Sequence, residues 1–254
     1  MSEPRANALL VAIQCYWGVA AILIGWQAWV LLSGVNSIIV PHPAAVVGDI
    51  FANPGLYLTN AGQTLLLAAA GLLLGMFLGT GMAILAWSSR VASGILVPLG
   101  LIFSSVPVVA LIPILARVLG YDLKTVLGIV AIISFFPAFV FTASGLRQTP
   151  PGSEDLFRAL GASRWLRFIH LILPSAVPNW LIALRLTAPP AVLAAMIAEF
   201  LMGQSGMGVL FREATTQFAT ERTFGTSLIA TIISVLCFSS ATLAERTVNE
   251  YWRA

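Results

Sequence analysis

The chain has 254 residues, of which 59% are hydrophobic and only 9% are charged, and its net charge is +3. Because soluble proteins carry about 25% charged residues, this composition excludes a water-soluble globular protein and indicates an integral membrane protein. The apolar runs are longer than the roughly ten-residue strands of a membrane β-barrel, so we predict an all-α integral membrane fold. The length suits one transmembrane domain over residues 1–254, and the small basic excess predicts no nucleic-acid partner.

Six apolar stretches are each long enough to cross a bilayer, which takes about 20 helical residues. The predicted spans are residues 9–32, 64–87, 94–119, 125–146, 176–202 and 224–243. The third, fourth and fifth predicted spans contain prolines, which favour kinks in a helix. These prolines are Pro98, Pro107, Pro113, Pro137, Pro189 and Pro190. We therefore predict six transmembrane helices, several of them bent.

In the second predicted span, Gly71, Gly75 and Gly79 recur every four residues. This spacing places three positions without side chains on one helix face, where a second helix can approach closely. The partner helix can belong to the same subunit or to a second copy of the chain, and the sequence leaves both possibilities open.

Orientation follows from the distribution of Arg and Lys, because positive residues are retained in the cytoplasm. With both termini inside, eight of the 13 basic residues are cytoplasmic: Arg5, Arg90, Arg147, Arg158, Arg164, Arg167, Arg246 and Arg253. The segment 33–63 between the first two spans contains no Lys or Arg, in agreement with an outside location. We predict a multi-pass membrane protein with both termini in the cytoplasm.

The segment 147–174, between the fourth and fifth predicted spans, is polar and carries four arginines. Two prolines and Gly152 end the preceding helix, and Ser153 is the predicted N-cap of a short helix with acidic residues in its first turn. Gly161 is predicted to end that helix. From the residues alone, this segment is either an amphipathic connector at the membrane surface or a docking element for a partner.

A motif in this segment resembles the signature loop of the permeases of ATP-binding-cassette (ABC) transporters. The family pattern is EAA, three residues, G, nine residues, I, one residue and LP. The same spacing occurs here in the sequence DLFRALGASRWLRFIHLILP, residues 155–174, although Asp155-Leu156-Phe157 replaces the usual Glu-Ala-Ala. The run LGAS, residues 160–163, is similar to that of the nitrate, sulfonate and taurine branch of the binding-protein-dependent permeases, and weaker similarity extends over most of the chain from about residue 40.

The resemblance implies that this loop contains a coupling helix that docks on a cytoplasmic ATPase dimer. It assigns the contact to Asp155, Leu156, Ala159, Leu160, Gly161, Ala162 and Ser163, with the motif residues Leu173 and Pro174. It further implies a location in the lipid bilayer of the bacterial inner membrane. A second copy of the permease and a periplasmic or lipid-anchored substrate-binding protein are the other partners that it implies. We expect no cofactor on this chain itself, with ATP and Mg bound by the ATPase, because no GxxxxGK[ST] sequence occurs here.

Charged residues within spans are costly and usually face a cavity or a partner. Arg185 and Glu199 lie in the fifth predicted span, about 21 Å apart along the helix, so they cannot pair with each other. Either they line the translocation path, or Arg185 reaches the headgroups or pairs within the bundle. The resemblance places Glu199, with Gly206 and Gly208, at an outer gate near the binding protein.

The alternative to a permease is an ion-coupled secondary transporter, and a membrane enzyme is a third hypothesis. A secondary transporter requires repeats and several acidic groups within its spans, and of these only Glu199 is found. A membrane enzyme requires a catalytic or metal-binding group, and the two histidines, His42 and His170, lie on opposite sides of the membrane. We therefore predict a transport subunit rather than an enzyme. The resemblance suggests a sulfonate, taurine, nitrate or similar small organic anion as substrate, with a thiamine pyrimidine precursor or riboflavin as the alternative.

Overall fold

The computed structural model describes residues 3–253, with side chains placed for residues 17–100, 102 and 106–250. Residues 1, 2 and 254 of the predicted domain lie outside the described residues. All regular elements in the described part of the chain are helical, which confirms the all-α fold. They are α1 (Glu3–Ser33), α2 (Pro43–Ala52), α3 (Pro54–Ser88), α4 (Arg90–Ser105), α5 (Val108–Leu119), α6 (Leu123–Gly145), α7 (Ser153–Ala159), α8 (Arg164–Arg167), the π-helical turn η1 (Phe168–Ile172), α9 (Leu173–Met202), α10 (Met207–Thr216) and α11 (Thr220–Arg253).

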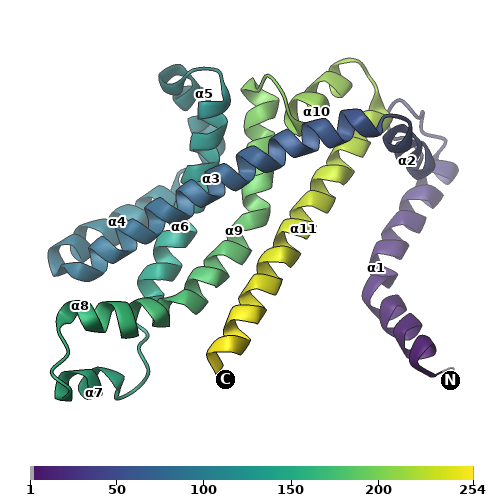
Figure 1. Ribbon diagram of the computed structural model, residues 1–254. Helices are drawn as coiled ribbons and strands as arrows, with labels where there is room; N and C mark the ends of the chain where they lie inside the picture. Colours follow the sequence, from purple (N-terminus) through teal and green to yellow (C-terminus); the bar gives the residue numbers. More distant parts are fainter. Residues whose placement is uncertain (1–2, 254) are drawn as a thin grey trace.

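The centre of the fold is formed by α3, α6 and α9, with α11 packed against α9. Helix α1 stands beside this bundle (Figure 1) and reaches it through α2 and through the rings of Trp26 and Phe224, whose centroids are 5.5 Å apart. The start of α1, the end of α11 and the short helix α7 lie at one end of the molecule, whereas α2 and α10 lie at the opposite end (Figure 1). The two ends therefore carry different short helices, which are the candidate functional elements.

Four helical segments of the described residues are long and apolar enough to cross a membrane: Pro54–Ser88, Leu123–Gly145, Arg164–Met202 and Thr220–Glu250. They correspond to the second, fourth, fifth and sixth predicted spans. The first predicted span falls in α1, where side chains are placed only from Trp17 onward.

The third predicted span, residues 94–119, differs from the expectation of one helix. It consists of α4 and α5, which are separated at Val106 and Pro107, where the backbone of Pro107 is extended (φ −67°, ψ 103°). Pro107 has no N–H and disfavours helical geometry at the residue before it, so the helix ends there and restarts at Val108. Pro98 and Pro113, by contrast, lie inside α4 and α5 without ending them.

The glycine repeat of α3 faces α6 of the same chain. A Cβ added at Gly71 would lie 2.5 Å from Cβ of Val130, and one added at Gly79 would lie 2.8 Å from Cβ of Ala138. One added at Gly75 would lie 2.6 Å from Cβ of Ser134. The backbones therefore approach as closely as the glycines allow, which confirms the intrasubunit interpretation of the repeat.

Candidate functional site

Helix α7 is a seven-residue helix between two glycines with left-handed backbone geometry, Gly152 (φ +77°) and Gly161 (φ +70°). The predicted N-cap was wrong by one residue: Gly152 is the cap, and Ser153 begins the helix with its hydroxyl donating to the carbonyl of Pro150. The acidic residues Glu154 and Asp155 occupy the first turn as predicted, where they oppose the positive end of the helix dipole.

The C-terminal end of α7 is a Schellman motif. The N–H of Ala162 donates to the carbonyl of Phe157 at 2.9 Å, and the N–H of Gly161 donates to the carbonyl of Arg158 at 3.0 Å. Gly161 occupies the left-handed position of this motif, which suits glycine because it has no Cβ. A new helix then begins at Arg164, and its N-cap is Ser163, whose hydroxyl accepts from the N–H of Leu166.

Most of the predicted ATPase-contact residues of α7 and its terminal turn lie on the surface of this short helix. Leu156 is 58% exposed and Leu160 is 74% exposed, and Asp155, Ala159, Gly161 and Ser163 are also exposed. Ala162 is half-buried. Leu173 and Pro174 do not belong to this surface, because they begin α9 on the far side of α8 and η1.

The two bulky residues that replace Ala-Ala in the motif point in different directions. Phe157 is half-buried against the apolar cluster formed by α3, α6 and η1. Leu156 is exposed. Of the two replacements, only Leu156 adds bulk to the exposed face of α7, whereas Phe157 anchors the short helix to the bundle.

At the opposite end of the molecule, the side chain of Glu199 is fully buried among α3, α9 and α10. Its Oε2 accepts from the hydroxyl of Thr64 at 2.7 Å and from the N–H of Gly208 at 3.0 Å. The same hydroxyl of Thr64 accepts from the N–H of Met207 at 2.8 Å, and Asn60 accepts from the N–H of Gly206 at 3.1 Å. Three successive backbone donors at the start of α10 are therefore held by side chains of α3 and α9.

The glycines of this turn leave the space that Glu199 fills. A Cβ added at Gly206 or at Gly208 would collide with the side chain of Glu199, and one added at Gly203 would lie 2.6 Å from its Cα. Gly206 also has φ +102°, which other residues rarely adopt. The structure thus brings together three predicted residues, Glu199, Gly206 and Gly208, in one buried cluster. Their role at an outer gate stays a prediction.

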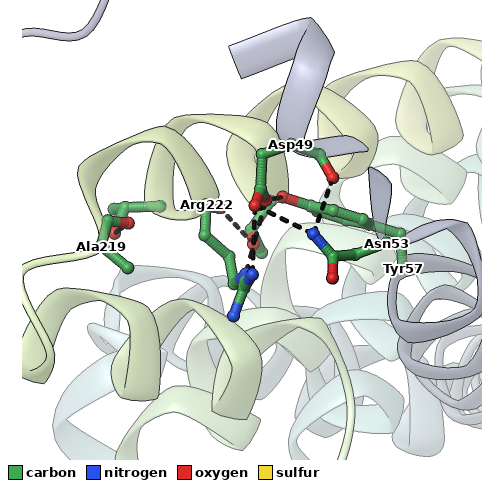
Figure 2. Close-up of polar contacts among 7 residues, drawn as sticks. Asp49, Asn53, Tyr57, Ala219 and Arg222 are labelled. Atoms are coloured by element: carbon green, nitrogen blue, oxygen red, sulfur yellow. Dashed lines mark hydrogen bonds and ion pairs between the residues drawn. The ribbon is translucent and has the colours of Figure 1, made fainter. Parts of the chain in front are cut away.

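A second polar cluster joins α2, α3 and α11 at the same end (Figure 2). Asp49 accepts from the hydroxyl of Tyr57 at 2.6 Å, from Nδ2 of Asn53 at 3.1 Å and from Nη2 of Arg222 at 3.1 Å. Burial by itself would raise the pKa of Asp49, but the hydrogen bonds from Arg222, Tyr57 and Asn53, together with the positive charge of Arg222, hold that pKa below its ordinary value.

The lowered pKa of Asp49 gives a test of this cluster. A carboxylate whose pKa is lower in the folded state adds stability above its unfolded pKa of about 4, and that stability is lost as the pH falls through the folded pKa. We expect Asp49→Asn to lower the free energy of unfolding by about 1–3 kcal/mol at pH 7, because Arg222 then loses a charged partner. Thermal unfolding at pH 7 and at pH 3 should show a smaller difference between variant and parent at the lower pH.

The matched control is Glu154→Gln, which removes the carboxylate of an exposed ion pair with Arg158. Exposed pairs of this kind contribute at most about 0.5 kcal/mol, so its melting temperature should stay near that of the parent. An equal loss of stability in the two variants would contradict the assignment of Asp49 as a structural clamp.

Sequence reasoning missed the three residues of α3 that hold these clusters. Tyr57, Asn60 and Thr64 are spaced by three and four residues, so they lie on one face of α3. That face contacts α2 through Tyr57 and the turn before α10 through the other two. The signal was a polar stripe with helical spacing near the N-terminal end of an apolar helix.

Arg185 forms an ion pair with Glu245, a residue that was not among the predicted site residues. Its Nη1 lies 2.9 Å from Oε2 of Glu245 in α11, and both side chains are largely buried. Pairing within the bundle was one of the two predicted alternatives for Arg185. The ion pair connects α9 to the C-terminal part of α11.

A cavity of about 490 Å³ lies among α3, α4, α5 and α6, beside the break between α4 and α5. Its lining is uncharged and includes three aromatic side chains, Phe135, Phe136 and Phe139. This volume lies within the range of about 300–1,000 Å³ that is usual for small-molecule sites.

Four apolar helical segments long enough to cross a membrane, with a buried polar turn at one end of the bundle and an exposed short helix at the other, define an integral membrane protein. The model of the family described as the inner membrane component of binding-protein-dependent transport systems matches residues 71–250. The chain therefore belongs to this family of ABC importer permeases.

Curated relatives agree with this family. The formylaminopyrimidine transport permease protein ThiX of Halalkalibacterium halodurans is 30% identical over 239 residues, which cover 94% of this chain and 91% of the relative. The putative aliphatic sulfonates transport permease protein SsuC of Bacillus subtilis is 28% identical, with 92% and 85% covered. An inward-facing structure of the MetNI methionine ABC transporter shares the fold with a TM-score of 0.66 at 17% identity, covering 76% of this chain and 96% of that one.

Proposed function

We propose that the chain is the membrane subunit of an ATP-driven importer and that α7 with its terminal turn is the coupling helix. In this proposal, α1, α3, the pair α4 and α5, α6, α9 and α11 make six crossings, with both termini and α7 in the cytoplasm. The supporting observation is the surface of α7, which exposes Leu156 and Leu160 to a degree that is unusual for a short polar segment. A cytoplasmic ATPase with an apolar groove would cover these side chains.

The proposed assembly contains two copies of the permease, two ATPase subunits that bind ATP and Mg, and an external substrate-binding protein. The attachment of α7 to the bundle would let a movement of the ATPase reach the membrane helices. Phe157 fixes α7 to the apolar cluster at the ends of α3 and α6, and Ser163 fixes the start of the helical segment that continues into α9. Movement of α7 by the ATPase would therefore move α9.

Two variants at one position test the coupling helix. A Cβ added at Gly161 would meet no described atom within 4 Å, so the strain of a Cβ there comes from the left-handed backbone conformation. We expect Gly161→Ala to cost about 1–2 kcal/mol in the local turn and to keep ATPase binding. Gly161→Trp should cost a similar amount in the turn but block the docking surface.

The measurement is co-purification of each variant with candidate ATPases, followed by ATP hydrolysis in proteoliposomes. Loss of the ATPase only in Gly161→Trp supports docking through this turn. Equal binding by the tryptophan variant and the parent would show that α7 is not the contact.

Two substrate classes are proposed. A small organic anion such as a sulfonate, taurine or nitrate is supported by the sulfonate permease relative. A pyrimidine precursor of thiamine is supported by the relative named for formylaminopyrimidine transport and by the uncharged, aromatic lining of the cavity among α3, α4, α5 and α6. Riboflavin, which is also an aromatic heterocycle, is a larger alternative to the pyrimidine. Uptake of radiolabelled taurine and of a labelled aminopyrimidine into the same proteoliposomes, with the matching binding protein, would separate the two classes.

A further inference from the structure

A recess of about 650 Å³ lies between the end of α3 and the segment formed by α7, α8 and η1. Ser88, which lines it, is the last residue of one membrane span, and Arg164, which also lines it, is the first residue of another. The recess therefore lies at the ends of two candidate membrane spans, where we expect the lipid headgroups.

The lining of this recess has an apolar part and a basic part. Ile84, Trp87, Phe168 and Ile172 form the apolar part, and the rings of Trp87 and Phe168 lie with centroids 5.0 Å apart. The ring of Trp165 also stacks on that of Phe168, with centroids 5.8 Å apart, and Trp165 is 69% exposed. Tryptophan at the end of a span is typical of the membrane–water interface, because its ring suits the headgroup region.

The basic part contains Arg158, Arg164 and Arg167 against one acidic residue, Glu154, which gives a net charge of +2. Glu154 is paired with Arg158 at 3.2 Å. Arg164 and Arg167 make no ion pair with any residue that the structure describes, and the buried Nε–H of Arg167 has no acceptor there either. A buried guanidinium donor without an acceptor favours an anion from outside the chain.

We propose that this recess binds the headgroup of an anionic phospholipid, with its phosphate on Arg164 and Arg167 and an acyl chain along Ile84 and Ile172. The mixed lining favours a lipid over a free phosphate, because a free anion would leave the apolar wall unused. The excess of arginine favours an anionic lipid over a zwitterionic one, and basic pockets between spans are known to bind such headgroups. The bound lipid would fill the space between the end of α3 and the segment that carries α7.

The test uses the full-length chain in mild detergent, with native mass spectrometry to count bound phosphatidylglycerol and phosphatidylcholine over a lipid titration. We expect the parent to retain phosphatidylglycerol preferentially. Each arginine near the headgroups contributes about a fivefold factor in affinity, so Arg164→Gln with Arg167→Gln should weaken phosphatidylglycerol binding about thirtyfold. Glu154→Gln should strengthen it about fivefold, a gain that misfolding cannot produce.

Two controls separate the recess from general charge effects. Arg90→Gln removes an exposed arginine at the start of α4 that does not line the recess, and its lipid binding should match that of the parent. Replacement of Arg164 and Arg167 by lysine keeps the charge and should retain most of the binding. The proposal is overturned if the double glutamine variant binds phosphatidylglycerol like the parent, if the two lipids bind equally, or if millimolar inorganic phosphate displaces the lipid.

Discussion

Replacing Glu199 with alanine is expected to lower the free energy of unfolding by about 3–5 kcal/mol. The carboxylate is fully buried, and a single oxygen of it accepts from the hydroxyl of Thr64 and the N–H of Gly208. Without that oxygen, a buried amide and a buried hydroxyl lose their acceptor, and a cavity opens against the bare backbone of Gly206. Thermal unfolding in detergent, followed by circular dichroism, should show a melting temperature lower by roughly 10 °C.

Two conservative variants show whether the hydrogen bonds or the charge matter. Glu199→Gln keeps an acceptor oxygen that can serve both donors, so we expect a loss within about 1 kcal/mol. Thr64→Val keeps the shape but removes the hydroxyl that accepts from the N–H of Met207, at a cost of about 1–3 kcal/mol. Alanine and glutamine variants of equal stability would rule out the hydrogen-bonded clamp. A stable glutamine variant that fails in transport would instead show that the charge itself is used, as predicted for a gate residue.

The surroundings of Glu199 illustrate what the sequence could not provide. Its position in an apolar span marked it as unusual, and the nearby glycines marked a turn. Its main side-chain partner, Thr64, is 135 residues away in the sequence, so their contact depends on how α3 and α9 pack. Arg185 is a similar case, because its partner Glu245 lies two residues after the end of the last predicted span. Pairwise contacts across a helix bundle are a property of packing, which periodicity alone does not determine.

The prolines show a second limit to prediction from the sequence. The sequence marked six prolines within spans as possible kinks, but only Pro107 separates two helices, whereas Pro137, Pro189 and Pro190 lie inside continuous ones. Whether a proline ends a membrane helix depends on whether neighbouring groups satisfy the freed carbonyls. That information is absent from the local sequence.

The loop that contains α7 was predicted more closely, because its determinants are local. Glycine at the left-handed position, acids in the first turn and a serine cap at the next helix act over three to five residues. The one error, Ser153 in place of Gly152 as the cap, arose because a left-handed glycine after two prolines also begins a helix. The direction of Phe157 into the apolar cluster, by contrast, required the folded bundle.

Replacing Gly75 with leucine is expected to separate α3 from α6 and to destabilise the chain by at least about 3 kcal/mol. A Cβ at this position would lie 2.6 Å from Cβ of Ser134 and 3.0 Å from the backbone nitrogen of Phe135, and it would also collide with the carbonyl of Ala131. Overpacking usually costs about 1–3 kcal/mol, and the cost is higher here because backbone atoms of α6 cannot rotate away. Loss of monodisperse protein in size-exclusion chromatography and a lower melting temperature would record the effect.

The matched control lies two turns further along the same helix. Gly81 is exposed, and a Cβ added there meets no atom within 4 Å, so Gly81→Leu changes helix propensity without a collision. Because leucine is favoured over glycine in a helix by about 1 kcal/mol, this variant should be as stable as the parent or slightly more stable. The two substitutions are chemically identical and are expected to differ in sign. If Gly75→Leu were as stable as Gly81→Leu, the close approach of α3 and α6 would not exist in the folded protein.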